Sequence, residues 1–255
     1  MSDTDHRDEA VSALAAREYE RAGDEYSRAA WAHLADPRDE VGPFDRSEKG
    51  WVARGLASLA TAAVAYRVAG EPGRATHRAV EGVALARDLE ESLDRAPQQA
   101  CLAEFVADFR LVGNLDGVED AYDDAEAAYR DAAPDIDDPT YWTTTPLFEA
   151  AAGTLEQVAR GTANGEIEVT WEALHGSDPA QVGAFLAHRV QFKRRRFPSY
   201  LKETLNSGYL AAPRGTTEYN NDTYHCSNCD GSDVNWTGNS VLCMRCSRPV
   251  RRRET

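Results

Sequence analysis

The chain has 255 residues, a formal net charge of −15 and a hydrophobic content of 42%. This length leaves room for more than one domain. The longest apolar stretch, residues 56–68, is interrupted by polar residues and is too short to span a bilayer, which excludes a membrane-spanning protein. The chain opens at Met1 without a charged-then-apolar leader, so we expect a soluble, cytoplasmic protein that binds no membrane.

The charged residues are unevenly distributed. Only Lys49, Lys193 and Lys202 of the 28 basic residues are lysines. An acidic, alanine-rich and lysine-poor composition resembles that of proteins from salt-loving archaea, whose surface carboxylates hold water where salt screens repulsion. From residue 191 onward eleven basic and six acidic residues give +5, whereas residues 1–190 carry −20. Such asymmetry indicates an interaction arm or a tail that folds back on an acidic body.

The N-terminal part contains a repeated pattern of an aromatic residue, three further residues, a glycine and an acidic or amide residue. The three copies have their glycine at Gly23, Gly70 and Gly113. A helical pattern runs into each glycine and another leaves it, so we expect each glycine to be the left-handed turn residue between antiparallel helices. Such self-similarity predicts stacked helical hairpins over about residues 5–133.

These segments resemble the tetratricopeptide repeat, which carries an aromatic residue four positions before the inter-helix glycine and small residues on the second helix. Ala75 and Ala79 suit the small positions, although Arg28 departs from them and the glycine spacing exceeds the family period of about 34 residues. The resemblance implies a repeat domain over residues 1–160 that binds another protein. An ordinary antiparallel bundle remains the alternative.

Further helices are predicted over residues 47–69, 97–112, 117–133 and 146–160, because prolines and polar residues mark their boundaries. Residues 167–171 alternate like a short strand, while residues 171–175 fit a helical turn equally well. A helix starts at Asp178, runs through the basic cluster and ends near Pro198, and a short helix follows over residues 199–206. We therefore divide the rest into a helical segment (161–212), a flexible polar linker (213–223) and a C-terminal module (224–255).

Two basic clusters are candidate contacts for a partner or for nucleic acid. They comprise Lys193, Arg194, Arg195 and Arg196, and Arg251, Arg252 and Arg253. Phe192 and Phe197 flank the first cluster and could stack on bases. The other interpretation is a solvated helix end whose cations pair with the acidic body. We favour the second, because high salt weakens binding that depends on counterion release.

Two Cys-x-x-Cys pairs near the C-terminus form the most specific pattern in the chain. The first pair is Cys226 and Cys229, the second pair is Cys243 and Cys246, and thirteen residues lie between the two pairs. A hairpin formed by these residues could bring the pairs together around one tetrahedral metal ion. This pattern resembles the zinc ribbon, a small β-hairpin module, over about residues 224–251. The resemblance implies structural Zn²⁺, since metal binding lets so small a module fold.

Other interpretations of the cysteines stay open. Disulfides would need an oxidising compartment, which the sequence does not indicate. Iron could occupy the same thiolates, because soft ligands do not by themselves select the metal. His225 lies beside Cys226 but is not needed to complete four ligands, and Cys101 fits a buried apolar position.

Sequence patterns of catalysis are missing. There is no His-Glu-x-x-His pair, phosphate-binding glycine loop or Gly-x-Ser-x-Gly turn, and the single Glu172/His175 pair is too little for a di-iron site. We therefore expect a mainly α protein with a small C-terminal β zinc ribbon that acts as a non-enzymatic protein-interaction adaptor. The alternative is a nucleic-acid-associated, transcription-linked regulator that uses the ribbon and the basic clusters.

Overall fold

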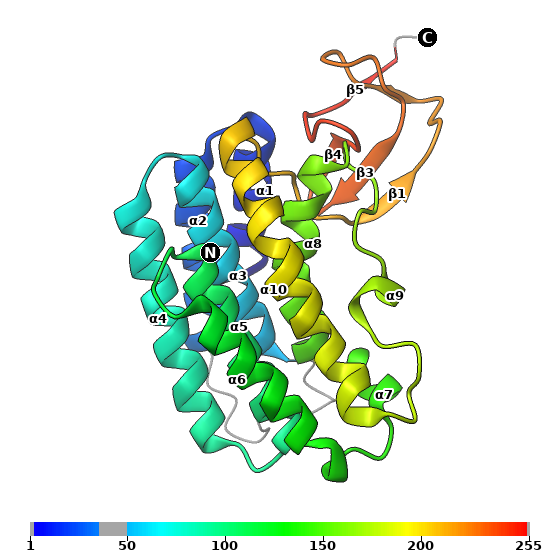
Figure 1. Cartoon of the computed structure of the whole chain (residues 1–255). Coiled ribbons are helices and arrows are strands. Elements are labelled where there is room, and N and C mark those ends of the chain that lie inside the picture. Colours follow the sequence, from blue (N-terminus) through cyan, green and yellow to red (C-terminus); the bar gives the residue numbers. More distant parts are fainter. Residues whose placement is uncertain (1–2, 36–49, 254–255) are drawn as a thin grey trace.

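The computed structural model describes residues 3–35 and 50–253, which form a helical bundle with a small sheet region at one end (Figure 1). The helices are α1 (Asp3–Ala16), α2 (Tyr19–Ala35), α3 (Trp51–Val68), α4 (Pro72–Ser92), α5 (Ala96–Val112), α6 (Val118–Asp131), α7 (Pro139–Thr143), α8 (Pro146–Thr162), α9 (Trp171–Leu174) and α10 (Val182–Ser207). The strands are β1 (Thr216–Glu218), β2 (Tyr224–His225), β3 (Val234–Thr237), β4 (Ser240–Cys243) and β5 (Arg251–Arg252). The predicted mainly α fold with a small C-terminal β region is confirmed.

Helices α1 to α6 follow one another as helical hairpins, and each helix packs on the next along the chain. Gly70, at φ 82°, is the left-handed turn residue between α3 and α4, as predicted. Between α5 and α6 the left-handed residues are Asn114, at φ 55°, and Gly117, at φ 72°. Gly113 has φ −83°, so the prediction that it is the left-handed residue is wrong. The start predicted at Ser47 lies outside the described residues, within which α3 begins at Trp51.

The prediction for Gly23 is wrong, because this glycine lies inside α2 and the first hairpin turns at Arg17, at φ 70°. A Cβ atom on Gly23 would lie 2.6 Å from Cε1 of Tyr66 on α3. The glycine therefore allows two helices to approach closely and does not form a turn. The repeated sequence pattern therefore contains glycine for two different reasons. Gly70 adopts a left-handed backbone conformation, whereas Gly23 leaves room for a neighbouring helix.

Helices α8 and α10 cover one face of this array. Helix α8 packs on α3 and α5, and α10 packs on α6 and α8 and also touches α3 and α5 (Figure 1). The side chains of Phe105, Phe109 and Phe148 are completely or almost completely buried in the shared core. The face of α3 and α5 that a stack of hairpins could offer to a partner is therefore occupied by the chain itself.

Helix α10 is continuous from Val182 to Ser207, so the predicted break near Pro198 is wrong. Proline removes one backbone donor from a helix and usually breaks it. Here Phe197 and Leu201 are buried beside the proline, at 0% and 2% exposure, and hold the helix against the bundle. Tertiary packing therefore outweighs the local preference.

The C-terminal sheet is larger than the sequence predicted. Strands β1, β3 and β4 form an antiparallel sheet in that order, and β2 pairs with β5. The predicted flexible linker over residues 213–223 is thus wrong, because β1 lies within it and pairs Thr216 with Trp236. The buried Asn221 side chain accepts hydrogen bonds from the backbone of Thr223 and Tyr224, which fixes the rest of the segment.

Two smaller features complete the fold. The ambiguous segment around residue 171 forms the helical turn α9, whose first turn is capped by the Thr170 side chain accepting from the Ala173 amide at 3.3 Å. Within residues 3–35 and 50–253, no helix combines the length and the apolar character that crossing a membrane requires.

We expect Gly70→Val to destabilise the α3–α4 turn by about 1–2 kcal/mol, because a β-branched residue strongly disfavours the left-handed conformation. The space around the glycine is open, so the cost is conformational and involves no clash. Gly73→Val is the matched control: this site is equally open but has no positive φ. Chemical denaturation should show a lower free energy of unfolding for Gly70→Val and not for Gly73→Val. Equal free energies of unfolding for the two variants would contradict this explanation.

Candidate metal centre

The two cysteine pairs form turns of the same geometry. The amide of Cys226 donates to the Gly231 carbonyl at 2.9 Å, and the amide of Asp230 donates to the Cys226 carbonyl at 2.8 Å. The second turn repeats this arrangement, with Cys243 donating to Arg248 at 2.7 Å and Ser247 to Cys243 at 2.9 Å. Asp230 and Ser247, which follow the second cysteine of each pair, are left-handed, at φ 55° and 51°.

These turns bring the four sulfur atoms together. The Sγ atoms of Cys226, Cys229, Cys243 and Cys246 all lie within 4.8 Å of one another. The Cys226–Cys246 and Cys229–Cys243 Sγ distances are both 3.5 Å, which is too long for a disulfide. A tetrahedral ion with Zn–S bonds of about 2.3 Å needs sulfur atoms about 3.8 Å apart, so the arrangement fits such an ion closely.

The electrostatics of the cluster favour a bound cation. A hydrogen bond between Cys243 and Cys246 lowers the pKa of Cys246 to about 4 and raises the pKa of Cys243. Four adjacent sulfurs cannot all ionise while no positive charge is present, because each thiolate disfavours the next. A divalent metal ion would convert the whole set to thiolates. The residues present therefore fit a metal ion held by four cysteines.

The neighbouring candidates lie outside this group. His225 is the last residue of β2 and directly precedes Cys226 in the sequence. The Nδ1 atom of His225 is buried without a hydrogen-bond partner in the described residues. Cys101 is buried in the helical bundle, where burial raises its pKa to about 12. In residues 3–35 and 50–253, the four cysteines are the one group of three or more His, Cys, Asp or Glu side chains close enough to hold a metal ion.

The second cysteine turn contacts the helical body through a backbone carbonyl and through the side chain of Ser247. Arg17, at the α1–α2 turn, donates to the Cys246 carbonyl at 2.5 Å. The Ser247 hydroxyl accepts from the Ala212 amide at 3.1 Å and from the Tyr209 hydroxyl at 3.0 Å. A small apolar cluster of Val11, Ala15, Ala212 and Leu242 also joins α1 to β4.

Arg160 of α8 joins the two parts most directly. Its guanidinium is buried and donates to the carbonyls of Gly165 at 2.9 Å, Ala212 at 2.7 Å and Met244 at 3.4 Å. Met244 lies between the candidate metal ligands Cys243 and Cys246. The position of the second cysteine turn is therefore fixed by α8, although Arg160 and Met244 are 84 residues apart in the sequence.

We expect Arg160→Met to loosen the C-terminal module, because buried carbonyls left without donors cost about 1–3 kcal/mol each. Hydrogen exchange should accelerate over residues 212–253 while α2 to α6 remain protected. Arg245→Met is the control, since Arg245 is half-exposed, contacts Asp233 within the module and should cost less than about 1 kcal/mol. Unchanged exchange in the Arg160 variant would contradict the anchoring role.

The structure separates the predicted basic candidates. Lys193 is completely buried, so the prediction that it contacts a partner or nucleic acid is wrong. Arg194 pairs with Asp123 on α6, and Arg196 lies over the ring of Tyr200. Phe197 is buried and unavailable for stacking. These contacts agree with the interpretation that the cluster pairs with the acidic body.

The second basic cluster is exposed. Arg251 and Arg252 form β5, which pairs with β2, and the Arg253 amide donates to the Thr223 carbonyl. The side chains of Arg251, Arg252 and Arg253 reach solvent. They are therefore available for a partner, unlike Lys193.

A buried charge cluster was missed by the sequence analysis. Glu104 and Asp108 on α5 face Arg189 and Lys193 on α10, and all four side chains are at most 3% exposed. Arg189 donates to both oxygens of Glu104, at 2.8 and 2.7 Å, and Lys193 lies 2.7 Å from Glu104. Both pairs have a spacing of four residues, which places them on one helical face, but that spacing is common on solvated helices and gave no signal of burial.

Two tyrosines of α6 complete this cluster. The Tyr129 hydroxyl donates to Glu104 at 2.7 Å, and the Tyr122 hydroxyl donates to Asp108 at 2.8 Å. Burial opposes the ionisation of Glu104, but Arg189 and Lys193 lower its pKa to about 2. Two carboxylates and two cations balance in charge, so the cluster links α5, α6 and α10 without an uncompensated ion.

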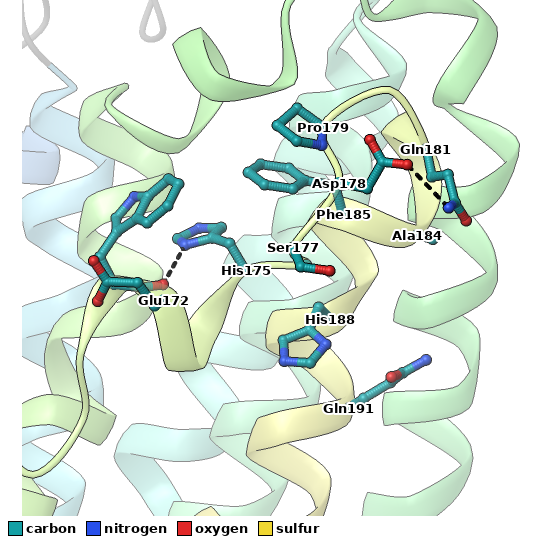
Figure 2. A pocket seen from close by; sticks show the side chains of 12 residues that line it. Glu172, His175, Ser177, Asp178, Pro179, Gln181, Ala184, Phe185, His188 and Gln191 are labelled. Carbon is teal, nitrogen blue, oxygen red and sulfur yellow. Dashed lines mark hydrogen bonds between the residues drawn. The ribbon is translucent and has the colours of Figure 1, made fainter.

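A cavity of about 620 Å³ lies between α9 and the start of α10 (Figure 2). His175 in its wall stacks on Phe185 at 5.5 Å and uses Nδ1 to bond the Trp171 carbonyl at 2.8 Å. Burial lowers the pKa of His175 to about 4, so the imidazole is neutral and its Nε2 can accept a hydrogen bond. No third His, Cys, Asp or Glu of the described residues lies close enough to Glu172 and His175 to complete a metal site with them.

Comparisons with protein-family models, with curated proteins and with solved structures gave no match. The fold and the site therefore define the class by themselves. The chain is a mainly helical protein with a C-terminal four-cysteine module that can bind a metal ion.

Proposed function

We propose that the protein is a non-enzymatic adaptor in which a structural Zn²⁺ ion fixes the C-terminal module on a helical body that binds another polypeptide. The observation that carries the zinc proposal is the set of four sulfurs within 4.8 Å of one another. Four thiolates complete the preferred tetrahedral coordination of zinc and leave no open position for a substrate, which favours a structural role.

The attachment of the module supports a scaffold role. The Cys246 carbonyl accepts from Arg17, and the Met244 carbonyl accepts from Arg160, so the metal-binding turn is part of the interface with the helices. A metal ion at this point would hold α1, α8 and the module in one arrangement. Because α8 and α10 cover the face of α3 and α5, we place the partner contact elsewhere on the helical body.

A pull-down in molar salt tests the adaptor proposal, with the intact zinc-loaded protein as bait and with bound protein and nucleic acid both identified. A stoichiometric protein partner that survives nuclease treatment supports it. The control bait replaces Arg251, Arg252 and Arg253 by serine and should keep the same partner. Recovery of nucleic acid without a protein partner would contradict the adaptor proposal.

A nucleic-acid-associated regulator is the second candidate, and one arrangement favours it. Tyr224 and Trp236 lie edge to face at 5.4 Å, and Tyr224 pairs across β2 and β5 with the exposed Arg252. Aromatic rings beside arginines suit single-stranded nucleic acid. If this candidate is right, a labelled oligonucleotide should bind the intact protein with strong salt dependence and lose affinity when the three arginines are replaced.

A further inference from the structure

A groove of about 570 Å³ lies between α8, residues 166–172 and the residues just before β1. Trp171 and Glu172 line this groove and also the cavity beside α9, so the two hollows adjoin at these residues. The groove lies at the junction of the helical body and the C-terminal module, because Arg160 and Arg214 both line it.

The groove presents apolar side chains to solvent. Ile167 is 58% exposed and Trp171 is 45% exposed, and Val169 between them is buried. One side of the Trp171 ring packs on His175 at a centroid distance of 4.6 Å, which holds the indole in place. An isolated exposed apolar residue needs no explanation, but a fixed indole beside an exposed isoleucine in a hollow indicates a binding surface.

The rim of the groove is acidic. Exposed glutamates surround the apolar residues, at Glu156, Glu166, Glu168 and Glu172. Glu166 accepts from the Tyr219 hydroxyl and Glu168 from the Tyr200 hydroxyl, both at 3.2 Å, and these neutral donors leave the carboxylate charges in place. A cationic ligand is therefore favoured, and the phosphates of a nucleic acid are disfavoured.

The two arginines of the groove offset only part of the charge of the four glutamates. Arg160 interacts with Glu166 at a distance, but neither arginine forms an ion pair with the rim in the described residues. Arg160 is buried and directed at three backbone carbonyls. Arg214 contacts the hydroxyls of Thr217 and Tyr219 through Nη2, while its Nη1 is buried without a hydrogen-bond partner among the described residues. A backbone carbonyl of a polypeptide bound in the groove would supply an acceptor for this donor.

We propose that this groove binds a partner polypeptide through a segment in which an apolar side chain stands beside lysine or arginine. The apolar side chain packs on Ile167 and Trp171, and the cations lie along the glutamate rim. This inference rests on the proposed adaptor function and names the surface and the chemistry of its partner.

The test uses the full-length, zinc-loaded protein and fluorescence anisotropy. The probe is a short labelled peptide that alternates leucine with arginine, and the comparison peptides carry glutamate for arginine or serine for leucine. We expect the first peptide to bind and both others to bind at least about tenfold more weakly. Raising the salt concentration should weaken, but not abolish, binding, because salt screens the charges and leaves the apolar contact.

Two variants test the site itself. Ile167→Ser should lower the affinity about tenfold, and Glu156→Arg should lower it several-fold at low salt only. Val80→Ser and Glu149→Arg are the matched controls, because Val80 is 50% exposed on α4 and Glu149 is exposed on α8 outside the groove. Zinc content and far-ultraviolet circular dichroism confirm that every variant is folded.

Several outcomes would overturn the proposal. The proposal fails if the leucine–arginine peptide does not bind, or if the glutamate peptide binds as tightly as the arginine peptide. It also fails if Ile167→Ser and Glu156→Arg leave the affinity for the arginine peptide unchanged. Light scattering that shows a dimer disrupted by Ile167→Ser would assign the groove to a second copy and also overturn it. If the pull-down recovers a protein partner equally with the Ile167→Ser bait, the groove proposal fails while the adaptor proposal stands.

Discussion

Replacing Cys243 by serine is expected to release the proposed Zn²⁺ ion and unfold the C-terminal module. Cys243 is completely buried at the end of β4, and its amide and carbonyl both form the second cysteine turn. Apparent zinc binding free energies in small modules are about 10–16 kcal/mol, so loss of one ligand removes most of what folds the strands. Helices α2 to α6 keep their mutual packing, and we expect the helical circular dichroism signal to be nearly unchanged.

Metal analysis and hydrogen exchange together check this prediction. The variant should lose stoichiometric zinc, and residues 224–250 should exchange rapidly. Cys101→Ala is the matched control, since Cys101 is buried in the bundle and contacts no other cysteine of the described chain. A Cys243 variant that keeps stoichiometric zinc would show that the four-cysteine site has been misassigned.

Replacing Glu104 by leucine should be the most destabilising single change in the helical body. The substitution leaves the buried Arg189 without a carboxylate partner in the described residues, and leaves Lys193 with Asp108 alone. Removing one partner of a buried ion pair typically costs about 3–5 kcal/mol, because an uncompensated charge stays in a low dielectric. Tyr129 also loses the acceptor for its hydroxyl.

Chemical denaturation followed by helical circular dichroism measures this cost. Arg194→Ala serves as the control, because the Arg194–Asp123 pair is on the surface and should contribute less than about 1 kcal/mol. The double variant Asp108→Leu/Lys193→Met should cost less than the sum of its single changes, since it removes a cation and an anion together. If Glu104→Leu were as stable as the Arg194 control, the buried cluster would not hold α10 on α5.

The convergence of the four cysteines on one point was predicted from the sequence, for a local reason. Each Cys-x-x-Cys turn is built from residues close in the chain, so the spacing alone specifies its geometry. The alternatives of iron and zinc stay open, because both accept four thiolates. The third strand was missed because β1 is short and polar, and it is stabilised by pairing with β3 and by the Asn235 side chain, which accepts from the Gly215 amide.

The basic run at residues 193–196 shows the opposite case. Its four cations look alike in the sequence, yet Lys193 is buried and Arg195 is exposed. A helix turns by about 100° per residue, so neighbours in a run point in different directions and one of them faces the bundle. Only the position of α10 against α5 decides which cation meets Glu104 and Asp108.

The helical class, the order of most helices, the Gly70 turn and the clustering of the four cysteines follow from the amino-acid sequence, because these depend on periodicity, turn chemistry and short spacings. Three features emerge only when distant segments pack together: Gly23 is a site of close helix contact, α10 runs through Pro198, and Arg160 and Arg17 hold the second cysteine turn. These features depend on residues far apart in the chain, and no local pattern encodes which distant surfaces will meet.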